Sequence, residues 1–246
     1  VYAAVTPYNF PAMVPLWFWP YAVGSGNTFV LKPSERVPLT QQFMFDLIDK
    51  AGFPAGVLNM VHGTREVVEA FTDHPDVAGV SFVGSTPVAE AVYKRASASG
   101  KRVQAFGGAK NHVVFMPDAN IEKSVDALVE SAFGCAGQRC LAASVALLVG
   151  DTYDQVRDAI VEKAKQIRVG DGLNEDTTMG PVINAGHQDK VMSYIASGIQ
   201  EGATLLLDGR GLKVDGYEDG DWVGPTIFEN VSPEMKIAKE EIFGPV

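Results

Sequence analysis

Between residues 28 and 106, short apolar stretches alternate with longer segments of helical periodicity, and this alternation restricts the fold more than any other feature. The predicted strands cover residues 28–31, 57–61, 77–83 and 101–106, and the predicted helices cover residues 39–51, 65–71 and 87–99. Strands that alternate with helices in this way usually form a parallel sheet with helices on its faces. The sequence therefore predicts an α/β fold with a parallel sheet.

The second half of the chain has the same α/β character in a less regular order. Its predicted strands cover residues 112–116, 144–149 and 203–207, and its predicted helices cover residues 121–132, 153–167 and 185–199. A chain of 246 residues is long enough for one large or two ordinary domains. We predict one domain over residues 1–106 and a second over residues 107–246. Within the first domain we also predict an apolar helix over residues 11–23.

Two of the predicted strands end at residues that suit a nucleotide. Lys32, Ser34 and Glu35 follow the first strand, and ligands of open α/β sheets bind beyond the carboxyl ends of strands. Gly84 and Ser85 follow the third strand, where the next helix offers free amides and a positive dipole to a phosphate. The local sequence alone also allows solvated loop charges at the first place and an ordinary helix cap at the second.

A candidate nucleophile lies in the second half, at Cys140. The stretch from residue 133 to 142 separates a predicted helix from a predicted strand, and Gly134 and Gly137 interrupt it. A thiol at such a junction, beside the cation Arg139 and near backbone amides, ionises more readily than a free cysteine. The alternative is that Cys140 is a small buried apolar residue, as unpaired cysteines often are. For Cys135 we expect only a place in the core or in the lining of a pocket.

Charge and cysteine content exclude several classes of function. The net charge of −10 opposes binding to nucleic acids or anionic membranes, and no basic run compensates for it. The two cysteines fit neither a disulfide framework nor a zinc site, so we expect no metal and a reducing compartment. The apolar stretch of residues 14–23 is too short to span a bilayer and contains prolines at positions 15 and 20, so we expect a core helix or a loop.

Several segments, in chain order, resemble the NAD(P)-dependent aldehyde dehydrogenases. They are residues 6–11, 32–35, 84–85 and 107–111, the set Phe133, Gly137, Gln138, Cys140 and Ala142, and residues 240–245. The resemblance extends over the whole chain and implies the aldehyde dehydrogenase fold. In that fold a Rossmann-like parallel-sheet cofactor domain precedes an α/β catalytic domain, and here both would be incomplete at the outer ends.

The resemblance also implies a role for particular residues. Cys140 would attack the aldehyde carbon, and Asn9 would donate to the oxyanion that forms on the substrate. The residues implied for NAD are Lys32, Ser34 and Glu35 on the adenosine side, Gly84 and Ser85 at the pyrophosphate, and Glu241 and Phe243 at the nicotinamide side. We place Arg139 and Phe10 in the substrate site, since a guanidinium beside the nucleophile can pair with a substrate carboxylate. By local sequence alone, Asn9 also fits a turn and Glu241 an exposed carboxylate.

One position departs from the pattern of the family. Hydrolytic members carry a Glu as general base at the position that aligns, through Gly108 and Lys110, with Phe106. Methylmalonate-semialdehyde dehydrogenases lack this Glu and release the acyl group to coenzyme A, and residues 109–112 and 137–140 also resemble that subfamily. The resemblance thus implies NAD-dependent oxidation of methylmalonate or malonate semialdehyde to an acyl-CoA. The alternatives are a hydrolytic aldehyde dehydrogenase and a nucleotide-binding remnant without catalysis.

The remaining expectations concern the whole protein. The chain starts at Val1 just before one motif and stops within another, so we expect a fragment that is inactive alone. The resemblance implies a homo-oligomer, a tetramer, for the full-length protein, with a small-molecule aldehyde as its substrate. We expect it in the bacterial cytoplasm or the mitochondrial matrix.

Overall fold

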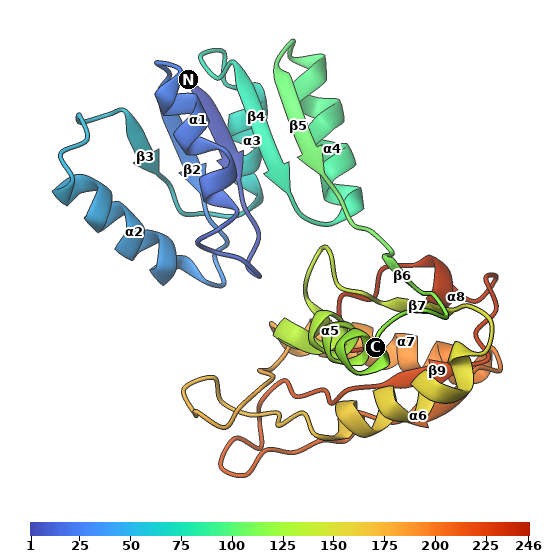
Figure 1. The fold of residues 1–246 in the computed structure, drawn as a ribbon. Coiled ribbons are helices and arrows are strands. Elements are labelled where there is room, and N and C mark those ends of the chain that lie inside the picture. Colours follow the sequence, from blue (N-terminus) through green and yellow to red (C-terminus); the bar gives the residue numbers. More distant parts are fainter. The chain divides into compact units, whose positions relative to one another are not determined.

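The computed structural model describes residues 1–246 and divides into two compact units, Val1–Gly108 and Ala109–Val246 (Figure 1). The predicted boundary lies after residue 106, two residues before the division between the units. Each unit has its own buried apolar core, as expected for independent packing. We therefore describe the two units separately.

The N-terminal unit is built on a five-stranded parallel sheet, which confirms the predicted fold class. The strands are β1 (Tyr2–Val5), β2 (Phe29–Lys32), β3 (Leu58–Met60), β4 (Gly79–Val83) and β5 (Arg102–Phe106). Their order in the sheet is β3-β2-β1-β4-β5, so the chain leaves the central strand β1 toward one edge and later returns to its other side. The sequence analysis missed β1, although it is the central strand.

Helices cover both faces of this sheet, which explains why its strands are apolar on both sides. The helices are η1 (Pro15–Trp17, 3₁₀), α1 (Trp19–Gly24), α2 (Pro38–Lys50), α3 (Arg65–Asp73) and α4 (Thr86–Ala98). Val5 packs with Phe71 of α3 and Val92 of α4, whereas Leu31 packs with Phe18 and Val14 on the opposite face. Figure 1 accordingly shows α3 and α4 behind the sheet and α1 in front of it.

The single helix predicted over residues 11–23 is wrong. The segment forms a turn, the short 3₁₀ helix η1 and the six-residue helix α1. Pro15 begins η1 and Pro20 lies in the first turn of α1. Because proline lacks an amide hydrogen and is tolerated at the start of a helix but not inside one, the two prolines divide the segment.

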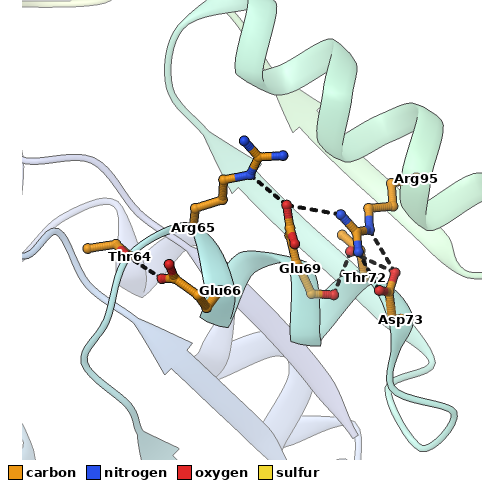
Figure 2. Close-up of polar contacts among 7 residues, drawn as sticks. All are labelled: Thr64, Arg65, Glu66, Glu69, Thr72, Asp73 and Arg95. Atoms are coloured by element: carbon orange, nitrogen blue, oxygen red, sulfur yellow. Dashed lines mark hydrogen bonds and ion pairs between the residues drawn. The ribbon is translucent and has the colours of Figure 1, made fainter.

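A network of charged side chains connects α3 to α4 on the surface of the N-terminal unit (Figure 2). Nε of Arg95, on α4, donates to Oδ1 of Asp73 over 2.8 Å, and Nη1 of Arg95 lies 3.1 Å from Oε1 of Glu69. Arg65 donates to the same Glu69 carboxylate over 2.6 Å. The hydrogen bond from Arg95 lowers the pKa of Asp73, and the one from Arg65 lowers the pKa of Glu69.

The C-terminal unit combines two small sheets with longer helices. Its elements are β6 (His112–Phe115), α5 (Ile121–Phe133), η2 (Gly134–Gly137), β7 (Val145–Leu148), α6 (Thr152–Lys165), α7 (Ala185–Gln200), β8 (Thr204–Leu207), β9 (Ile227–Glu229) and α8 (Lys236–Lys239). Strands β6 and β7 are parallel neighbours, and α5 connects them. Val125 and Leu128 of α5 pack with Val156 and Ile160 of α6 in the main core.

The predicted helices and strands of this unit are confirmed within a few residues, but β9 and α8 were missed. Strand β9 has three residues and pairs antiparallel with β8, and α8 has four residues. Elements of this length carry too little periodicity to stand out in a sequence. Throughout the chain, no helix combines the length and the apolar character needed to cross a membrane.

Candidate functional site

The predicted cofactor residues of the N-terminal unit gather at one edge of its sheet. Lys32 is the last residue of β2, Gly84 follows β4, and Asn9 lies in the loop that follows β1. The three strands are parallel neighbours, so their carboxyl ends meet at the same edge. Because β2 and β4 lie on opposite sides of β1, this edge contains a topological switch point, where α/β sheets bind their ligands.

Lys32 and Glu35 form an ion pair beyond the end of β2. Lys32 is only 4% exposed, and its Nζ donates to the carbonyl of Pro33 over 2.8 Å and to Oε2 of Glu35 over 3.2 Å. Burial by itself raises the pKa of Glu35, but hydrogen bonds from its own amide and from Lys32 outweigh that effect, so its pKa is lowered. Ser34 is buried, and its hydroxyl accepts a hydrogen bond from the amide of Arg36. These contacts fix the turn after β2.

Gly84 and Ser85 connect β4 to the first turn of α4. A Cβ on Gly84 would lie 2.6 Å from the ring of Phe82, so a side chain does not fit there without movement. Ser85 is the cap residue of α4, but its side chain makes no capping hydrogen bond. The backbone amides in the first turn of α4 therefore lack a side-chain cap. Uncapped amides at the start of a helix can bind a phosphate.

The loop after β1 carries Asn9 and Phe10, both half-buried. The amide of Val14 donates to the carbonyl of Phe10 over 3.2 Å, and the buried side chain of Gln41 donates to the carbonyl of Pro11. The hydroxyl of Thr6, which the sequence analysis did not select, is buried at the end of β1 and has no hydrogen-bond partner. A buried hydroxyl without a partner is unusual and marks a position that suits a polar ligand group.

Phe106 ends β5 with its side chain 49% exposed. Its ring stacks on that of Phe18, with 6.4 Å between the ring centroids. The position that we align with the general base of hydrolytic family members thus holds an apolar ring on a partly open surface. A phenyl group can neither accept nor donate the proton that hydrolysis requires.

Cys140 lies in the loop between α5 and β7, and the loop begins with an unusual left-handed turn. Cys135, Ala136 and Gly137 have φ values of 52°, 53° and 67°. Only glycine adopts this region without steric cost, so Cys135 and Ala136 are strained. A Cβ on Gly137 would lie 2.0 Å from the carbonyl oxygen of Gly244, so the turn packs directly on the backbone of a distant segment.

The left-handed turn also corrects our expectation for Cys135. Its side chain is exposed rather than in the core or in a pocket, whereas Cys140 is half-buried. The strained backbone at Cys135 is followed by Ala136 and Gly137, which are both buried, so the turn places its small residues inside and the thiol outside. Of the two cysteines, Cys140 therefore has the more enclosed surroundings.

The side-chain amides of Gln138 and Asn111 hold the loop that carries Cys140. Gln138 is 6% exposed, donates to the carbonyls of Cys135 and Pro181, and accepts from the amide of Ile183. Asn111 donates to the carbonyl of Cys140 over 2.8 Å and to that of Ala142 over 3.0 Å. The sequence analysis quoted Asn111 within a motif without giving it a role.

Arg139 folds back over the end of α5. Its guanidinium covers Gly134, where a Cβ would lie 2.5 Å from Nη2, and its Nη1 lies 3.4 Å from the carbonyl oxygen of Glu130. The Nε atom of Arg139 is buried and has no hydrogen-bond partner. Since a guanidinium carries five N–H donors, this side chain has donors left for a ligand carboxylate.

The segment with Glu241 and Phe243 contacts the same loop through Gly244. Oε1 of Glu241 accepts from the amide of Ala109 over 3.3 Å. Phe243 is a second strained residue, with φ of 60°, and its carbonyl accepts a hydrogen bond from Nε2 of His187 over 2.5 Å. Burial lowers the pKa of His187.

The adjacent Glu240 is held by Tyr194, whose hydroxyl donates to Oε2 of Glu240 over 2.6 Å. Burial and this carboxylate raise the pKa of Tyr194 to about 12, so the phenol remains a donor at neutral pH. The Cys140 loop and the segment with Glu241 and Phe243 thus meet within the C-terminal unit where Gly137 packs on Gly244.

Lys110 is a titratable residue that the sequence analysis quoted only as part of a motif. Burial lowers the pKa of its amine to about 8, although the charge of Glu241 opposes the shift. Lys110 lines a cavity of about 520 Å³ whose other walls include Leu128, Phe133 and Phe228. Cys140 does not line this cavity, so we do not regard it as the catalytic pocket.

Comparisons with known proteins agree with this arrangement. The model of the aldehyde dehydrogenase family matches residues 1–246. Malonate-semialdehyde dehydrogenase 1 of Oceanobacillus iheyensis is 52% identical to the chain over 246 residues, which are 100% of the chain and 50% of that protein. The chain thus spans about half the length of the curated relatives it matches.

Solved structures show the same fold. Methylmalonate-semialdehyde dehydrogenase of Oceanimonas doudoroffii has a TM-score of 0.97 and 49% identity over 100% of this chain and 50% of its own. A Sinorhizobium meliloti protein solved in complex with NAD has a TM-score of 0.97 and 46% identity over 99% of this chain and 50% of its own. The predicted fold and the resemblance are both confirmed, and the chain belongs to the aldehyde dehydrogenase family.

Proposed function

We propose that the protein containing this chain oxidises malonate or methylmalonate semialdehyde with NAD and transfers the acyl group from Cys140 to coenzyme A. The observation that carries this proposal is the apolar side chain of Phe106 at the position of the hydrolytic base, in a chain whose relatives are named for these semialdehydes. Without a base to activate water, a thiol is the better acceptor for the acyl group.

Cys140 acts as the nucleophile. Its thiolate adds to the aldehyde carbon and later holds the acyl group as a thioester, which coenzyme A cleaves through its own thiol. Asn9 donates to the oxygen that becomes negatively charged, together with backbone amides. Support for Cys140 over Cys135 comes from its half-buried position in a loop that two amide side chains hold in place.

Arg139 and Phe10 contribute to substrate selection. The buried Nε of Arg139, which has no hydrogen-bond partner, and the weakly engaged Nη1 favour a substrate with a carboxylate at its far end. Malonate and methylmalonate semialdehydes have such a carboxylate, whereas simple aldehydes such as propanal do not.

The residues at the sheet edge and near Gly244 fit NAD. The uncapped start of α4 at Gly84 and Ser85 suits a pyrophosphate, and the fixed pair of Lys32 and Glu35, with Ser34 beside it, suits ribose hydroxyls. Glu241 and Phe243 are assigned to the nicotinamide side. When bound, NAD supplies the electron acceptor for the oxidation.

For the whole protein we propose that residues 1–106 form part of the NAD-binding domain and residues 107–246 part of the catalytic domain. We also propose a homo-oligomeric enzyme, a tetramer, in the bacterial cytoplasm or the mitochondrial matrix. The family membership and the bacterial relatives support these assignments.

The test is NADH formation by the full-length protein with malonate semialdehyde, with and without coenzyme A. Without coenzyme A we expect a burst of NADH close to one per active site, followed by a slow phase, because the thioester persists. Addition of coenzyme A should accelerate the slow phase and give an acyl-CoA. Cys140→Ala should abolish the burst, and Cys135→Ala should retain it.

The rival functions give different results in the same assay. A hydrolytic aldehyde dehydrogenase would turn over at the same rate without coenzyme A and release the free acid. A nucleotide-binding remnant would bind NAD but show no burst with any aldehyde. Loss of the burst in Cys135→Ala with a full burst in Cys140→Ala would overturn the assignment of the nucleophile.

A further inference from the structure

We propose that Asn111 is a positioning residue for Cys140: its side-chain amide fixes the turn that carries the nucleophile. This inference rests on the proposed function, because it assigns a purpose to the geometry around Cys140. Nδ2 of Asn111 donates to two backbone carbonyls of that turn, those of Cys140 and Ala142.

The topology of the C-terminal unit places Asn111 beside this turn. Strands β6 and β7 are parallel neighbours, so their amino ends lie at the same edge of the sheet. Asn111 directly precedes β6, and the loop with Cys140 directly precedes β7. The carbonyl of Asn111 also accepts from the amide of Val145 over 3.1 Å, which fixes the backbone from which its side chain extends.

Backbone hydrogen bonds define the turn that carries Cys140. The amide of Ala142 donates to the carbonyl of Arg139 over 3.1 Å, so Cys140 and Leu141 are the two central residues of the turn. Leu141 is 83% exposed and packs against no core that could orient the turn. Asn111 makes two hydrogen bonds to the backbone of this turn, one at the nucleophile and one two residues beyond it.

The side-chain amide of asparagine suits this task for a chemical reason. It has two N–H donors on one nitrogen and can satisfy two carbonyls at once. Aspartate has the same size but offers only oxygen atoms when ionised, and these would face the two carbonyl oxygens. Leucine has a similar volume and would leave both carbonyls without this donor.

The test measures the NADH burst of the full-length protein for Asn111→Asp and Asn111→Leu. A displacement of the nucleophile by about 1 Å can reduce the rate about 100-fold, so we expect the rate constant of the burst to fall roughly 10- to 100-fold. The amplitude of the burst and the dissociation constant for NAD should stay close to those of the unchanged protein. A merely structural role would instead lower the amplitude, because fewer molecules fold, and leave the rate constant of the folded fraction unchanged.

The matched control is Asn230→Asp in the same unit, since Asn230 also donates through Nδ2 but to Thr204, away from the Cys140 loop. We expect it to leave the burst unchanged. If Asn111→Leu does not fold, Asn111→Asp and Asn111→Gln, which keep a polar side chain, carry the test.

Two failures can be told apart. Burst rate constants within about twofold of the unchanged protein in all the folded Asn111 variants would overturn the positioning role, with Cys140→Ala still inactive. A normal burst in Cys140→Ala would overturn the proposed function, and the positioning role with it, because the turn would then carry no nucleophile.

Discussion

In the N-terminal unit the predicted site residues follow the ends of regular parallel strands, whereas in the C-terminal unit Cys140 follows a strained left-handed turn. The strand order alone brings Asn9, Lys32 and Gly84 to one edge of the first unit. In the second unit, side chains from distant positions must hold the loop: Asn111 at Cys140 and Gln138 near Pro181. Topology thus accounts for the position of the proposed cofactor site, whereas the position of the proposed nucleophile depends on individual hydrogen bonds.

The largest expected effect is that of Gly137→Ala, which tests the strained turn. The new Cβ would meet the carbonyl of Gly244 at 2.0 Å in a left-handed conformation. Strain and overpacking together should lower the free energy of unfolding by roughly 2–5 kcal/mol, measured by urea denaturation. The matched control is Gly172→Ala, where no atom lies within 4 Å of the new Cβ, and we expect a change within about 0.5 kcal/mol.

The counterpart in the N-terminal unit is Gly84→Ala. Its Cβ would meet only the ring of Phe82, at 2.6 Å, and Gly84 is not in the left-handed region. We expect a smaller loss of stability than for Gly137→Ala. An equal or larger loss would show that the first unit also depends on a strained backbone position, and the comparison would fail.

A smaller effect is expected for Gln138→Leu, which removes the side-chain amide that joins the Cys140 loop to residues 181–183. The change leaves the amide of Ile183 and two carbonyls without this partner, so we expect a loss of about 1–3 kcal/mol in unfolding free energy. The NADH burst should slow as well, because the loop loses an anchor.

Gln41→Leu gives the matched measurement in the N-terminal unit. Gln41 is also buried, but its amide makes one hydrogen bond, to the carbonyl of Pro11 in the loop with Asn9. We expect a smaller loss of stability and little change in the burst. If Gln41→Leu slowed the burst as much as Gln138→Leu, the loop of the first unit would depend on a side-chain anchor to the same degree.

The smallest effect is expected for Asp73→Asn in the surface network of Figure 2. The pKa of Asp73 is lowered in the folded protein, so its ion pair stabilises the fold above the unfolded value of 3.8. This contribution is lost as the pH falls below 3.8 and through the lower folded pKa. The difference in unfolding free energy between Asp73→Asn and the unchanged protein should therefore be fully present at pH 7 and shrink in acid. A difference that did not change with pH would contradict this origin.

Most elements could be predicted because their apolar periodicity is clear, but the exceptions have identifiable causes. Strand β1 has only four residues, two of them alanines, and forms the centre of the sheet through partners far away in sequence. The helix predicted over residues 11–23 is divided because Pro15 and Pro20 start new segments. A short strand that forms mainly through pairing with distant strands cannot be recognised from the local sequence pattern.

The candidate site shows the same limit. The residues beyond β2 and β4 could be selected because ligands bind at strand ends, and their roles stay predictions. The left-handed turn could not be predicted, since Cys135 and Ala136 are not residues that favour positive φ. Asn111 could not be given its role, because the carbonyls that it holds lie 29 and 31 residues further along the chain.

The place of β1 in the sheet has a consequence for synthesis on the ribosome. Tyr2 of β1 lies opposite Phe29 of β2 on one side and Gly79 of β4 on the other. Translation adds roughly 5–20 residues per second, so after β2 has emerged, β1 waits for seconds before its second neighbour exists. During that time the unpaired backbone N–H and C=O groups of β1 form an open edge to which other nascent chains can pair. The central strand of the folded unit is thus an edge strand while the unit is being made.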